Sequence, residues 1–233
     1  MRSRRKPLFL PPGAPLSFPD PETSDDEGLL AIGGDLTPER LLFAYERGVF
    51  PWYDEGLPPM WWSPNPRAVM DAEQLHVSRS LRRVMRSDRF TVSFDRAFPS
   101  VMLECGRERE SGTWILPEMV DAYCELHALG HAHSVEVWRG EALVGGLYGV
   151  QRGALFAAES MFHRERDASK VALASAIERL FAAGIQLFDV QFLTGHLASL
   201  GAYEISRTEY LARAARAVNS AVDLELGAWT RPR

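Results

Sequence analysis

Three polar side chains lie near the ends of two apolar segments, where a carboxylate or an amide needs a reason. Asp189 and Gln191 interrupt the apolar run from 187 to 193, and Glu159 is near the end of the run from 154 to 160. In an extended strand Asp189 and Gln191 share one face, about 7 Å apart at roughly 3.3 Å per residue. Buried polar groups of this kind need hydrogen bonds or a charged ligand. The three residues therefore predict either a pocket suited to cations or an internal structural network.

The two apolar runs belong to a larger pattern that can position these residues. An Ala-rich segment from 169 to 183 has helical composition and lies between them. Strand, helix and strand in this order form a crossover unit, in which the two strands run parallel with right-handed chirality. Ligands bind outside the carboxyl ends of such strands, which is where the three polar residues are expected. The other face of the second strand is expected to carry Phe188, Val190 and Phe192.

The chain divides into two parts at about residue 65. Residues 1–65 hold most of the prolines and one clear helix, from 38 to 47, which Thr37 can cap. Residues 66–233 have longer periodic segments. Besides the crossover unit, they are predicted to form helices at 117–129 and 208–218 and strands at 134–138 and 142–150, with an irregular loop at 161–167. We predict an α+β fold, with a small loop-rich N-terminal domain (1–65) and a larger mixed-sheet domain (66–233).

The composition is that of a globular protein of a reducing compartment. With 233 residues, 46% of them hydrophobic, the chain can bury a sizeable core. The apolar stretch after the basic residues 2–6 stops at Pro11, too early for a signal-peptide core, and no stretch reaches membrane-spanning length. The two cysteines, Cys105 and Cys124, form no CxxC pattern. We expect a cytoplasmic protein, and a monomer because no pattern marks a dimer surface.

Two local features could bind nucleic acid, although the net charge of -5 gives no general attraction. The first is a set of arginines at helical spacing that share one face: Arg79, Arg82, Arg83 and Arg86. This face predicts either contacts to an RNA backbone or a plain solvated helix. The second is a group of large aromatic residues close in sequence: Trp52, Tyr53, Trp61 and Trp62. It predicts either a hydrophobic plug between domains or a platform on which an unpaired base stacks.

Other chemistries find little support in the sequence. No GxxxxGK[ST] pattern for a phosphate-binding loop is present, and neither Ser160 nor Ser169 has the GxSxG context of a serine hydrolase. His131 and His133 could share a strand face as metal ligands, but no third ligand has recognisable spacing. The Gly145-Gly146 pair lies within a strand pattern, which favours a bulge or a close backbone approach. We therefore expect no metal site.

With these residues identified, the chain resembles the leucyl/phenylalanyl-tRNA-protein transferase family over nearly its whole length. Eight blocks in the same order carry the resemblance: GLLAIGGDLTPERLLFAYERGVFPWY (28–53), WWSPNPRAVM (61–70), GTWI (112–115), LHALGHAHSVEVW (126–138), LVGGLYGV (143–150), ESMF (159–162), ASK (168–170) and SLGAYEISR (199–207). The stretch from 191 to 197 departs from the family pattern at the turn before His196, which bears on the shape of the acceptor pocket.

The resemblance implies a fold for the larger domain and a donor substrate. That domain should be similar to the N-acetyltransferase fold. Acetyltransferases of this fold place a Gln/Arg-x-x-Gly-x-Gly/Ala loop before the helix that follows, where it holds the cofactor pyrophosphate. This chain has MFHRERD at 161–167 instead, so a coenzyme A donor is not expected.

The implied activity is transfer of leucine, phenylalanine and, less efficiently, methionine from aminoacyl-tRNA to the α-amino group of proteins that begin with arginine or lysine. Such transfer marks the acceptor for degradation by the N-end rule pathway. The implied partners are aminoacyl-tRNA and these acceptor proteins, with no membrane. No cofactor is expected, because the ester is already activated and needs neither ATP nor a metal.

Carried over by position, the resemblance assigns the catalytic site to Glu159, Asp189 and Gln191. It assigns stacking of the tRNA 3′ adenosine to Trp52 and Trp114. An arginine or lysine amino terminus brings two positive groups, which two carboxylates can engage. We hypothesise that Asp189 polarises Gln191, whose carbonyl oxygen holds the attacking amine, and that Glu159 recognises the basic side chain.

The aminoacyl group would need an apolar pocket, for which Phe156 and Leu147 are candidate linings, with plain core as the alternative. Two other functions are compatible with the same sequence. One is an aminoacyl-tRNA-dependent transferase that acts on a different amine, such as a cell-wall peptide. The other is a module that binds tRNA ends without catalysis, which would not require Glu159, Asp189 and Gln191 together.

Overall fold

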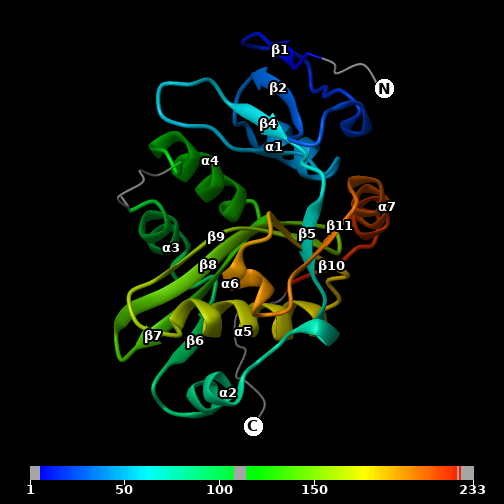
Figure 1. The fold of residues 1–233 in the computed structure, drawn as a ribbon. Coiled ribbons are helices and arrows are strands. Elements are labelled where there is room, and N and C mark those ends of the chain that lie inside the picture. Colours follow the sequence, from blue (N-terminus) through cyan, green and yellow to red (C-terminus); the bar gives the residue numbers. More distant parts are fainter. Residues whose placement is uncertain (1–5, 108–113, 225, 227–233) are drawn as a thin grey trace.

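The computed structural model describes residues 6–107, 114–224 and 226, which form two β-sheets with flanking helices (Figure 1). The smaller sheet has the order β1-β2-β4-β3 and the larger the order β11-β5-β10-β9-β8-β7-β6. The smaller sheet contains β1 (Leu8–Leu10), β2 (Leu29–Gly33), β3 (Phe50–Pro51) and β4 (Met60–Trp62). The larger contains β5 (Arg67–Met70), β6 (Thr91–Phe94), β7 (Ala132–Arg139), β8 (Ala142–Arg152), β9 (Leu155–His163), β10 (Leu187–Gln191) and β11 (Tyr203–Ile205). The fold is α+β, as predicted.

Seven α-helices occur among the described residues, together with two short 3-10 helices at Pro21–Thr23 and Ala72–Gln74. They are α1 (Pro38–Tyr45), α2 (Arg79–Arg86), α3 (Phe98–Cys105), α4 (Pro117–Ala128), α5 (Ala168–Ala182), α6 (Gly195–Ala198) and α7 (Arg207–Val218). The predicted helices are present with small shifts at their ends. The cap of α1 is also present, since Thr37 Oγ1 accepts from the backbone N–H of Arg40 at 3.4 Å. No described helix is long and apolar enough to cross a membrane.

The predicted crossover unit is confirmed. β9 and β10 pair in parallel, from Leu155 opposite Leu187 to Ala157 opposite Asp189, and α5 connects them. Helix α5 covers one face of the larger sheet while α3 and α4 cover the other (Figure 1). The start of α5 lies against β8 because Gly145 has no side chain; a Cβ there would lie 2.6 Å from that of Ala168. The Gly-Gly pair thus permits close packing, one of the two alternatives predicted.

Two parts of the sheet differ from the sequence-based expectation. β9 continues to His163, so the predicted loop from 161 to 167 is partly strand. β5 lies between β10 and β11 and is antiparallel to both, an insertion that no local pattern predicted. Beyond Ala157 the edge of β9 has no strand partner from β10. The two parallel strands therefore separate at the end where the polar residues lie.

The two sheets lie in different parts of the sequence but share a core. All strands of the smaller sheet precede residue 63, and those of the larger sheet begin at Arg67. One buried cluster nevertheless joins Leu41 and Trp61 of the N-terminal part to Tyr123 and Tyr148 of the larger part. In Figure 1 the N-terminal part lies above the separated ends of β9 and β10. It is therefore positioned to contribute to a site at those ends.

Candidate functional site

Asp189 lies in β10 with no exposed surface, and its carboxylate is fully paired. Arg67 of β5 donates to both oxygens, from Nε to Oδ1 at 2.9 Å and from Nη2 to Oδ2 at 2.6 Å. The Tyr210 hydroxyl donates to Oδ2 at 2.8 Å, and the backbone N–H of Gln191 donates to Oδ1 at 2.9 Å. A paired guanidinium and carboxylate fix geometry as well as charge. Asp189 is thus a buried anchor with no surface for a substrate.

Arg67 is held as tightly as its partner. Its guanidinium carbon lies 4.6 Å from the ring centre of Phe50 and 4.4 Å from that of Tyr210, so the group is between two aromatic rings. A further N–H donates to the carbonyl of Gly48 at 3.3 Å. Burial lowers the pKa of Arg67, but the charge of Asp189 outweighs it and the net shift is upward. The pair neutralises itself, so Asp189 has no free charge for a cationic acceptor, contrary to the sequence-based interpretation.

Gln191 has a backbone φ of 61°, and the register of β10 against β5 shifts between Asp189 and Gln191. This bulge ends the predicted alternation of side chains. Phe188 and Val190 pack in the core with α5, whereas Phe192 has its ring 5.5 Å from that of Trp52 on the other side of the strand end. The prediction that Phe192 shares a face with Phe188 was wrong, because the left-handed residue at 191 interrupts the alternation of side chains.

Glu159 has the opposite environment to Asp189. Nε2 of Gln191 donates to its Oε1 at 2.7 Å, while Oε2 is buried without a hydrogen-bond partner among the described residues. Burial raises the pKa of Glu159 to about 8; the Tyr45 hydroxyl and Arg67 oppose this shift and Asp189 adds to it. The carbonyl oxygen of Gln191 accepts no hydrogen bond within the described chain. Oε2 of Glu159 and the side-chain carbonyl oxygen of Gln191 therefore have no partner in the described chain.

Three buried tyrosines from separate elements surround Glu159: Tyr45 of α1, Tyr123 of α4 and Tyr148 of β8. The hydroxyls of Tyr45 and Tyr123 are 2.6 Å apart, and the ring centres of Tyr123 and Tyr148 are 5.8 Å apart with edge-to-face geometry. Burial and then the nearby Glu159 raise the pKa of all three. They remain neutral hydroxyl groups in the physiological range. The hydroxyl of Tyr148 has no partner in the described chain.

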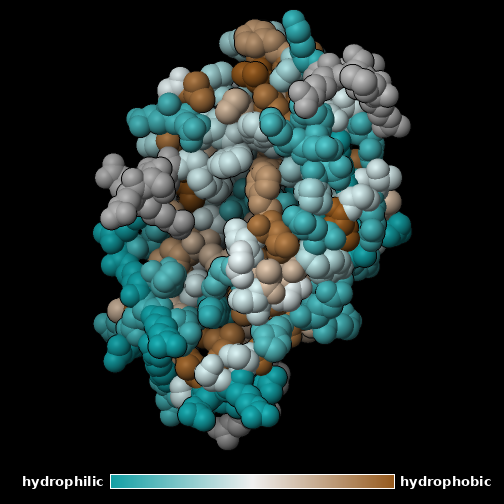
Figure 2. Space-filling model, viewed as in Figure 1, coloured by the Kyte–Doolittle hydropathy of each residue, from teal (hydrophilic) through white to brown (hydrophobic). Residues whose placement is uncertain are grey.

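The aromatic group divides into a buried part and an exposed part. Trp61 and Tyr53 are buried in the core shared by the two parts of the chain. Trp52 is 40% exposed, with the rings of Trp62 and Phe192 at 6.0 and 5.5 Å. Figure 2 shows an apolar strip in the middle of this face, near β10 and α6 of Figure 1. The open tryptophan offers a stacking surface.

The other aromatic and apolar candidates lie elsewhere. Trp114 is half-buried against the core that includes α4, and Gly112 and Thr113 of its GTWI block are outside the described residues. Phe156 and Leu147 are each 1% exposed, in the core beneath α5, and the Phe156 ring packs on that of Phe188. Both are therefore packed as core residues in this structure, and their part in an aminoacyl pocket stays a prediction.

The four arginines of α2 share an exposed face, as their spacing predicts, and line a surface hollow of about 450 Å³ with Ser87. Arg82 makes one long bond, 3.4 Å, to the carbonyl of Val77. None of the four forms an ion pair with a carboxylate of the described chain. The helix lies far from the separated strand ends, at the opposite end of the molecule from the N-terminal part (Figure 1).

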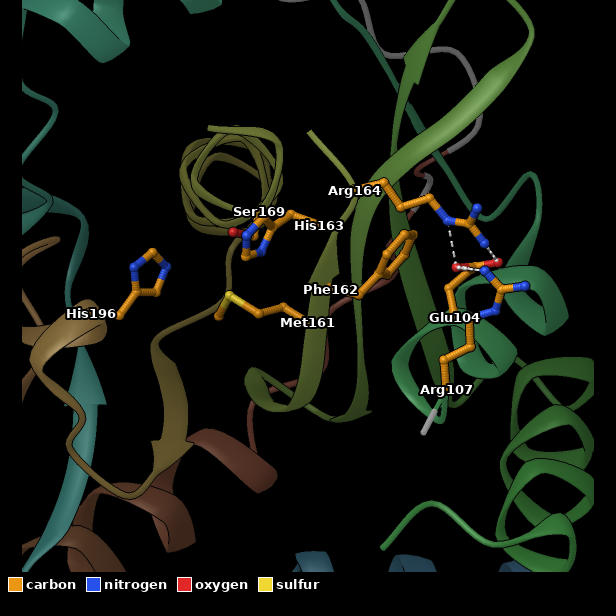
Figure 3. Close-up of a pocket in the computed structure, with 8 residues that line it drawn as sticks. All are labelled: Glu104, Arg107, Met161, Phe162, His163, Arg164, Ser169 and His196. Atoms are coloured by element: carbon orange, nitrogen blue, oxygen red, sulfur yellow. Dashed lines mark hydrogen bonds and ion pairs between the residues drawn. The ribbon is translucent and has the colours of Figure 1, made fainter. Parts of the chain in front are cut away.

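A larger cavity, of about 600 Å³, adjoins the site at the start of α5 (Figure 3). It is lined by Glu104, Arg107, Met161, Phe162, His163, Arg164, Ser169 and His196. In the close-up, His196, Met161, His163 and Ser169 form one part of the lining, and the ion-paired side chains form the other. His131 and His133, considered above as metal ligands, are not among the residues that line this cavity. His133 instead bonds to Asp95 at 2.7 Å and Gln151 at 3.1 Å.

Several residues of the site were not found from the sequence alone, chiefly Arg67, Tyr45, Tyr123, Tyr148 and Tyr210. One signal could have identified the arginine. RAVM begins with a charged residue in an otherwise apolar segment, and a buried charge needs a partner. The tyrosines gave no such signal because each fits the apolar pattern of its own helix or strand.

The comparisons with known proteins agree over nearly the whole chain. The family model described as leucyl/phenylalanyl-tRNA protein transferase matches residues 69–215, and the model of its N-terminal domain matches residues 34–65. Three relatives bear the name leucyl/phenylalanyl-tRNA–protein transferase. The Anaeromyxobacter sp. (strain Fw109-5) protein is 56% identical over 88% of both chains. The Edwardsiella ictaluri protein is 54% identical over 84% of this chain and 82% of the relative. The Syntrophobacter fumaroxidans protein is 54% identical over 84% and 85%.

Solved structures give a more distant match. A GCN5-related N-acetyltransferase from Kribbella flavida aligns with a TM-score of 0.40 at 11% identity, over 72% of this chain and 61% of that one. This similarity adds nothing to the sheet order already described. Identity above 50% over most of both chains is far more specific. The chain belongs to the leucyl/phenylalanyl-tRNA–protein transferase family, whose members are aminoacyltransferases.

Proposed function

We propose that this chain moves leucine, phenylalanine and, less efficiently, methionine from aminoacyl-tRNA to the α-amino group of proteins that begin with arginine or lysine. Transfer would mark these proteins for degradation by the N-end rule pathway. The enzyme acts as a monomer in the cytoplasm, the compartment that holds charged tRNA. The family assignment supports the aminoacyltransferase activity, and the separated strand ends support the choice of acceptor.

The pairing of Gln191 with Glu159 is the observation that carries the proposal. Because Nε2 donates to Glu159 at 2.7 Å, the carbonyl oxygen of the amide is directed elsewhere and is unpaired in the described chain. An amide oxygen only accepts hydrogen bonds. It can therefore hold an N–H of the acceptor amine without removing its proton. This geometry suits positioning of a nucleophile at an activated ester.

Glu159 supports a preference for a basic acceptor. With a pKa of about 8 in the empty site, the buried carboxyl is mostly protonated at pH 7. A bound cation would favour its ionised form, because an opposite charge within a few ångströms stabilises a carboxylate. Binding of an arginine or lysine amino terminus is thereby coupled to release of a proton from Glu159. An alanine amino terminus brings one positive group fewer.

The reaction is an aminolysis with a simple balance. The neutral amine nitrogen forms a bond to the ester carbonyl carbon, and the bond from that carbon to the ribose oxygen breaks. The amine gives up one proton and the ribose oxygen gains one. If the acceptor arrives as an ammonium, one further proton leaves to solvent. Neither Gln191 nor the buried Asp189 needs to act as a strong base in this scheme.

Asp189 acts through position rather than contact. Its Oδ1 accepts the backbone N–H of Gln191 at 2.9 Å, and its Oδ2 is held by Arg67 and Tyr210. These bonds support the bulge that directs the Gln191 side chain towards Glu159. This role replaces direct polarisation of the Gln191 amide, because no bond joins the two side chains in the described structure.

The direct test is a transfer assay with labelled leucyl-tRNA and three peptides that differ only in the first residue. Peptides that begin with arginine and lysine should be labelled, and one that begins with alanine should not. Absence of label on both basic peptides would exclude the proposal. A cell-wall transferase would ignore all three peptides, and a tRNA-end binding module would retain donor affinity but no transfer.

A further inference from the structure

The cavity beside the start of α5 presents polar groups that the transfer step leaves unused. It borders the edge of β9 beyond Ala157, where the strand has lost its partner β10. Met161 and His163 of β9, Ser169 of α5 and His196 of α6 all line it (Figure 3). Met161 lies two residues along β9 from Glu159, about 7 Å at the rise of a strand. The cavity is thus next to the reacting groups but does not contain them.

Ser169 presents an unused hydroxyl donor to the cavity. The residue is 5% exposed and lines the cavity, yet its hydroxyl has no hydrogen-bond partner among the described residues. The hydroxyl opens to the cavity and is free to donate to a group bound there. In Figure 3 its side chain lies with those of His163 and Met161, facing the side from which His196 approaches. A ligand with acceptor oxygens would satisfy it.

The backbone at this point favours an anion. Helix α5 has 15 residues, and no side chain caps its first turn; Asp167, the residue before it, has a φ of 73° and makes no capping bond. The N–H of Ala168 bonds to the carbonyl of Glu165 at 3.2 Å, so the N–H groups of Ser169 and Lys170 are the ones left at the positive end of the helix dipole. Such an end binds phosphate groups well. Ser169 is in this first turn.

The charges around the cavity are also favourable. Lys170 follows Ser169 and forms no ion pair with a carboxylate of the described chain. Burial, followed by Lys170 and His163, lowers the pKa of His196, as expected where positive charge is not compensated. A neutral imidazole still donates one N–H. Hydroxyl, imidazole and backbone donors therefore meet near one uncompensated positive charge.

The nearby carboxylates are each matched by arginine. Glu104 in the cavity wall accepts from Nε of Arg164 at 2.7 Å, and Arg107 lies 3.8 Å from it. Glu165 accepts from Arg139 at 2.9 Å and from Arg89 at 3.3 Å. Asp167, at the helix start, faces Arg166 at 3.9 Å. These acidic groups do not leave a net negative potential at the cavity.

We propose that this cavity binds the phosphodiester that joins the last two nucleotides of the donor tRNA, through the Ser169 hydroxyl, the first turn of α5 and His196. This inference rests on the proposed function, because it assigns one contact of the same donor. The terminal nucleotide carries the reacting ester on its ribose, so its own phosphate is the one nearest to Glu159 and Gln191. Holding that phosphate would fix the ribose, and with it the ester, against the acceptor amine.

The test isolates the charge of that link with two dinucleotides of identical bases. Cytidylyl-adenosine carries the natural phosphodiester, and its methylphosphonate analogue is neutral. The wild-type protein should bind the natural dinucleotide about tenfold more tightly, as for hydrogen bonds to a charged group. Ser169→Ala and His196→Gln should remove most of this difference. Ser175→Ala is the matched control, because Ser175 is a buried, unpaired serine of the same helix outside the cavity lining.

The same pair of compounds, leucylated, separates the possible outcomes. In transfer to an arginine peptide, Ser169→Ala should lower kcat/KM for the phosphodiester donor and leave the methylphosphonate donor unchanged. Equal binding of the two dinucleotides by the wild type would overturn the inference. Equal losses for both donors in the variants would do the same, since they would indicate a general defect. Binding without any transfer would refute the proposed function alone.

Discussion

Asp189 and Glu159 lie on neighbouring parallel strands, but their carboxyl groups have opposite surroundings. Asp189 accepts from a guanidinium, a phenol and a backbone N–H, and has no exposed surface. Glu159 accepts from one amide, keeps one oxygen unpaired, and has a pKa of about 8. A satisfied buried carboxylate maintains structure. A buried carboxyl with a raised pKa and one unpaired oxygen is typical of a functional site.

The largest effect is expected from breaking the ion pair between Arg67 and Asp189. Arg67→Met should reduce the free energy of unfolding by about 3–5 kcal/mol, because Asp189 would be left as an uncompensated buried charge. Urea denaturation at pH 7 measures the change. Arg152→Met is the matched control: Arg152 pairs with Glu46 at 2.6 Å but is partly exposed, so its loss should be about 1 kcal/mol or less.

A double variant sharpens the same point by separating stability from activity. Arg67→Met combined with Asp189→Leu removes both charges, and it should be more stable than Arg67→Met alone. It should still transfer little leucine, because the backbone N–H of Gln191 loses its acceptor. A double variant with full activity would show that the network has no positioning role.

The next effect concerns the carboxyl group of Glu159 and depends on pH. The pKa of Glu159 in the folded protein, about 8, is above its ordinary value of 4.5, so between these values the folded state binds more protons than the unfolded state. The contribution of Glu159 to the free energy of unfolding should therefore be full below about pH 4.5 and fall as pH rises towards 8, by roughly 1–4 kcal/mol in total. Glu159→Gln should flatten this slope and abolish the preference for basic acceptors. Parallel pH profiles for both proteins would contradict the assignment.

A smaller effect is expected at Trp52, in the N-terminal part of the chain. Trp52→Ala should weaken donor binding by about 1–3 kcal/mol, the usual contribution of one stacked base, with little change in thermal stability because Trp52 is 40% exposed. Leu57→Ala, at an exposed apolar residue of the same region, is the control. If donor affinity survived in Trp52→Ala, the adenosine would have to stack elsewhere.

The smallest effect tests whether distant charge contributes to donor binding. Arg82→Glu with Arg83→Glu reverses two charges on the exposed face of α2. Affinity for tRNA should fall, and the slope of log affinity against log salt should decrease in magnitude by about 1 or more. Transfer from a leucylated dinucleotide should be unchanged, because the dinucleotide does not reach α2. Unchanged tRNA binding would leave this face as a solvated helix surface.

The sequence predicted the helices and the parallel strands around Asp189 and Glu159, but it did not predict that β5 pairs with β10. Composition and capping residues predicted α1 and α5, and the order of segments predicted that β9 and β10 are parallel. The insertion of β5 could not be predicted, because antiparallel pairing between residues 67–70 and 187–191 leaves no periodic signal in either segment. The environment of Asp189 depends on that insertion.

The bulge at Gln191 was also beyond reach of pattern analysis. Alternation is a reliable guide only while the backbone stays extended, and a glutamine gives no sign that its φ will be 61°. The resemblance to a family named Glu159, Asp189 and Gln191 together, and strand geometry grouped Gln191 with Asp189; the bond from Gln191 to Glu159 is seen only in the structure. The contrast between the two carboxylates emerged only from the packed structure.

The bond between Arg67 and Asp189 joins residues 122 positions apart, and Tyr210 follows Asp189 by a further 21. Contacts between such distant residues are made only after the entropy of closing a long loop has been lost. During synthesis the first of these groups leaves the ribosome long before the last. Until α7 has emerged, the nascent chain lacks the Tyr210 hydroxyl, so the bonds that fix Asp189 and the backbone of Gln191 are completed only late in synthesis.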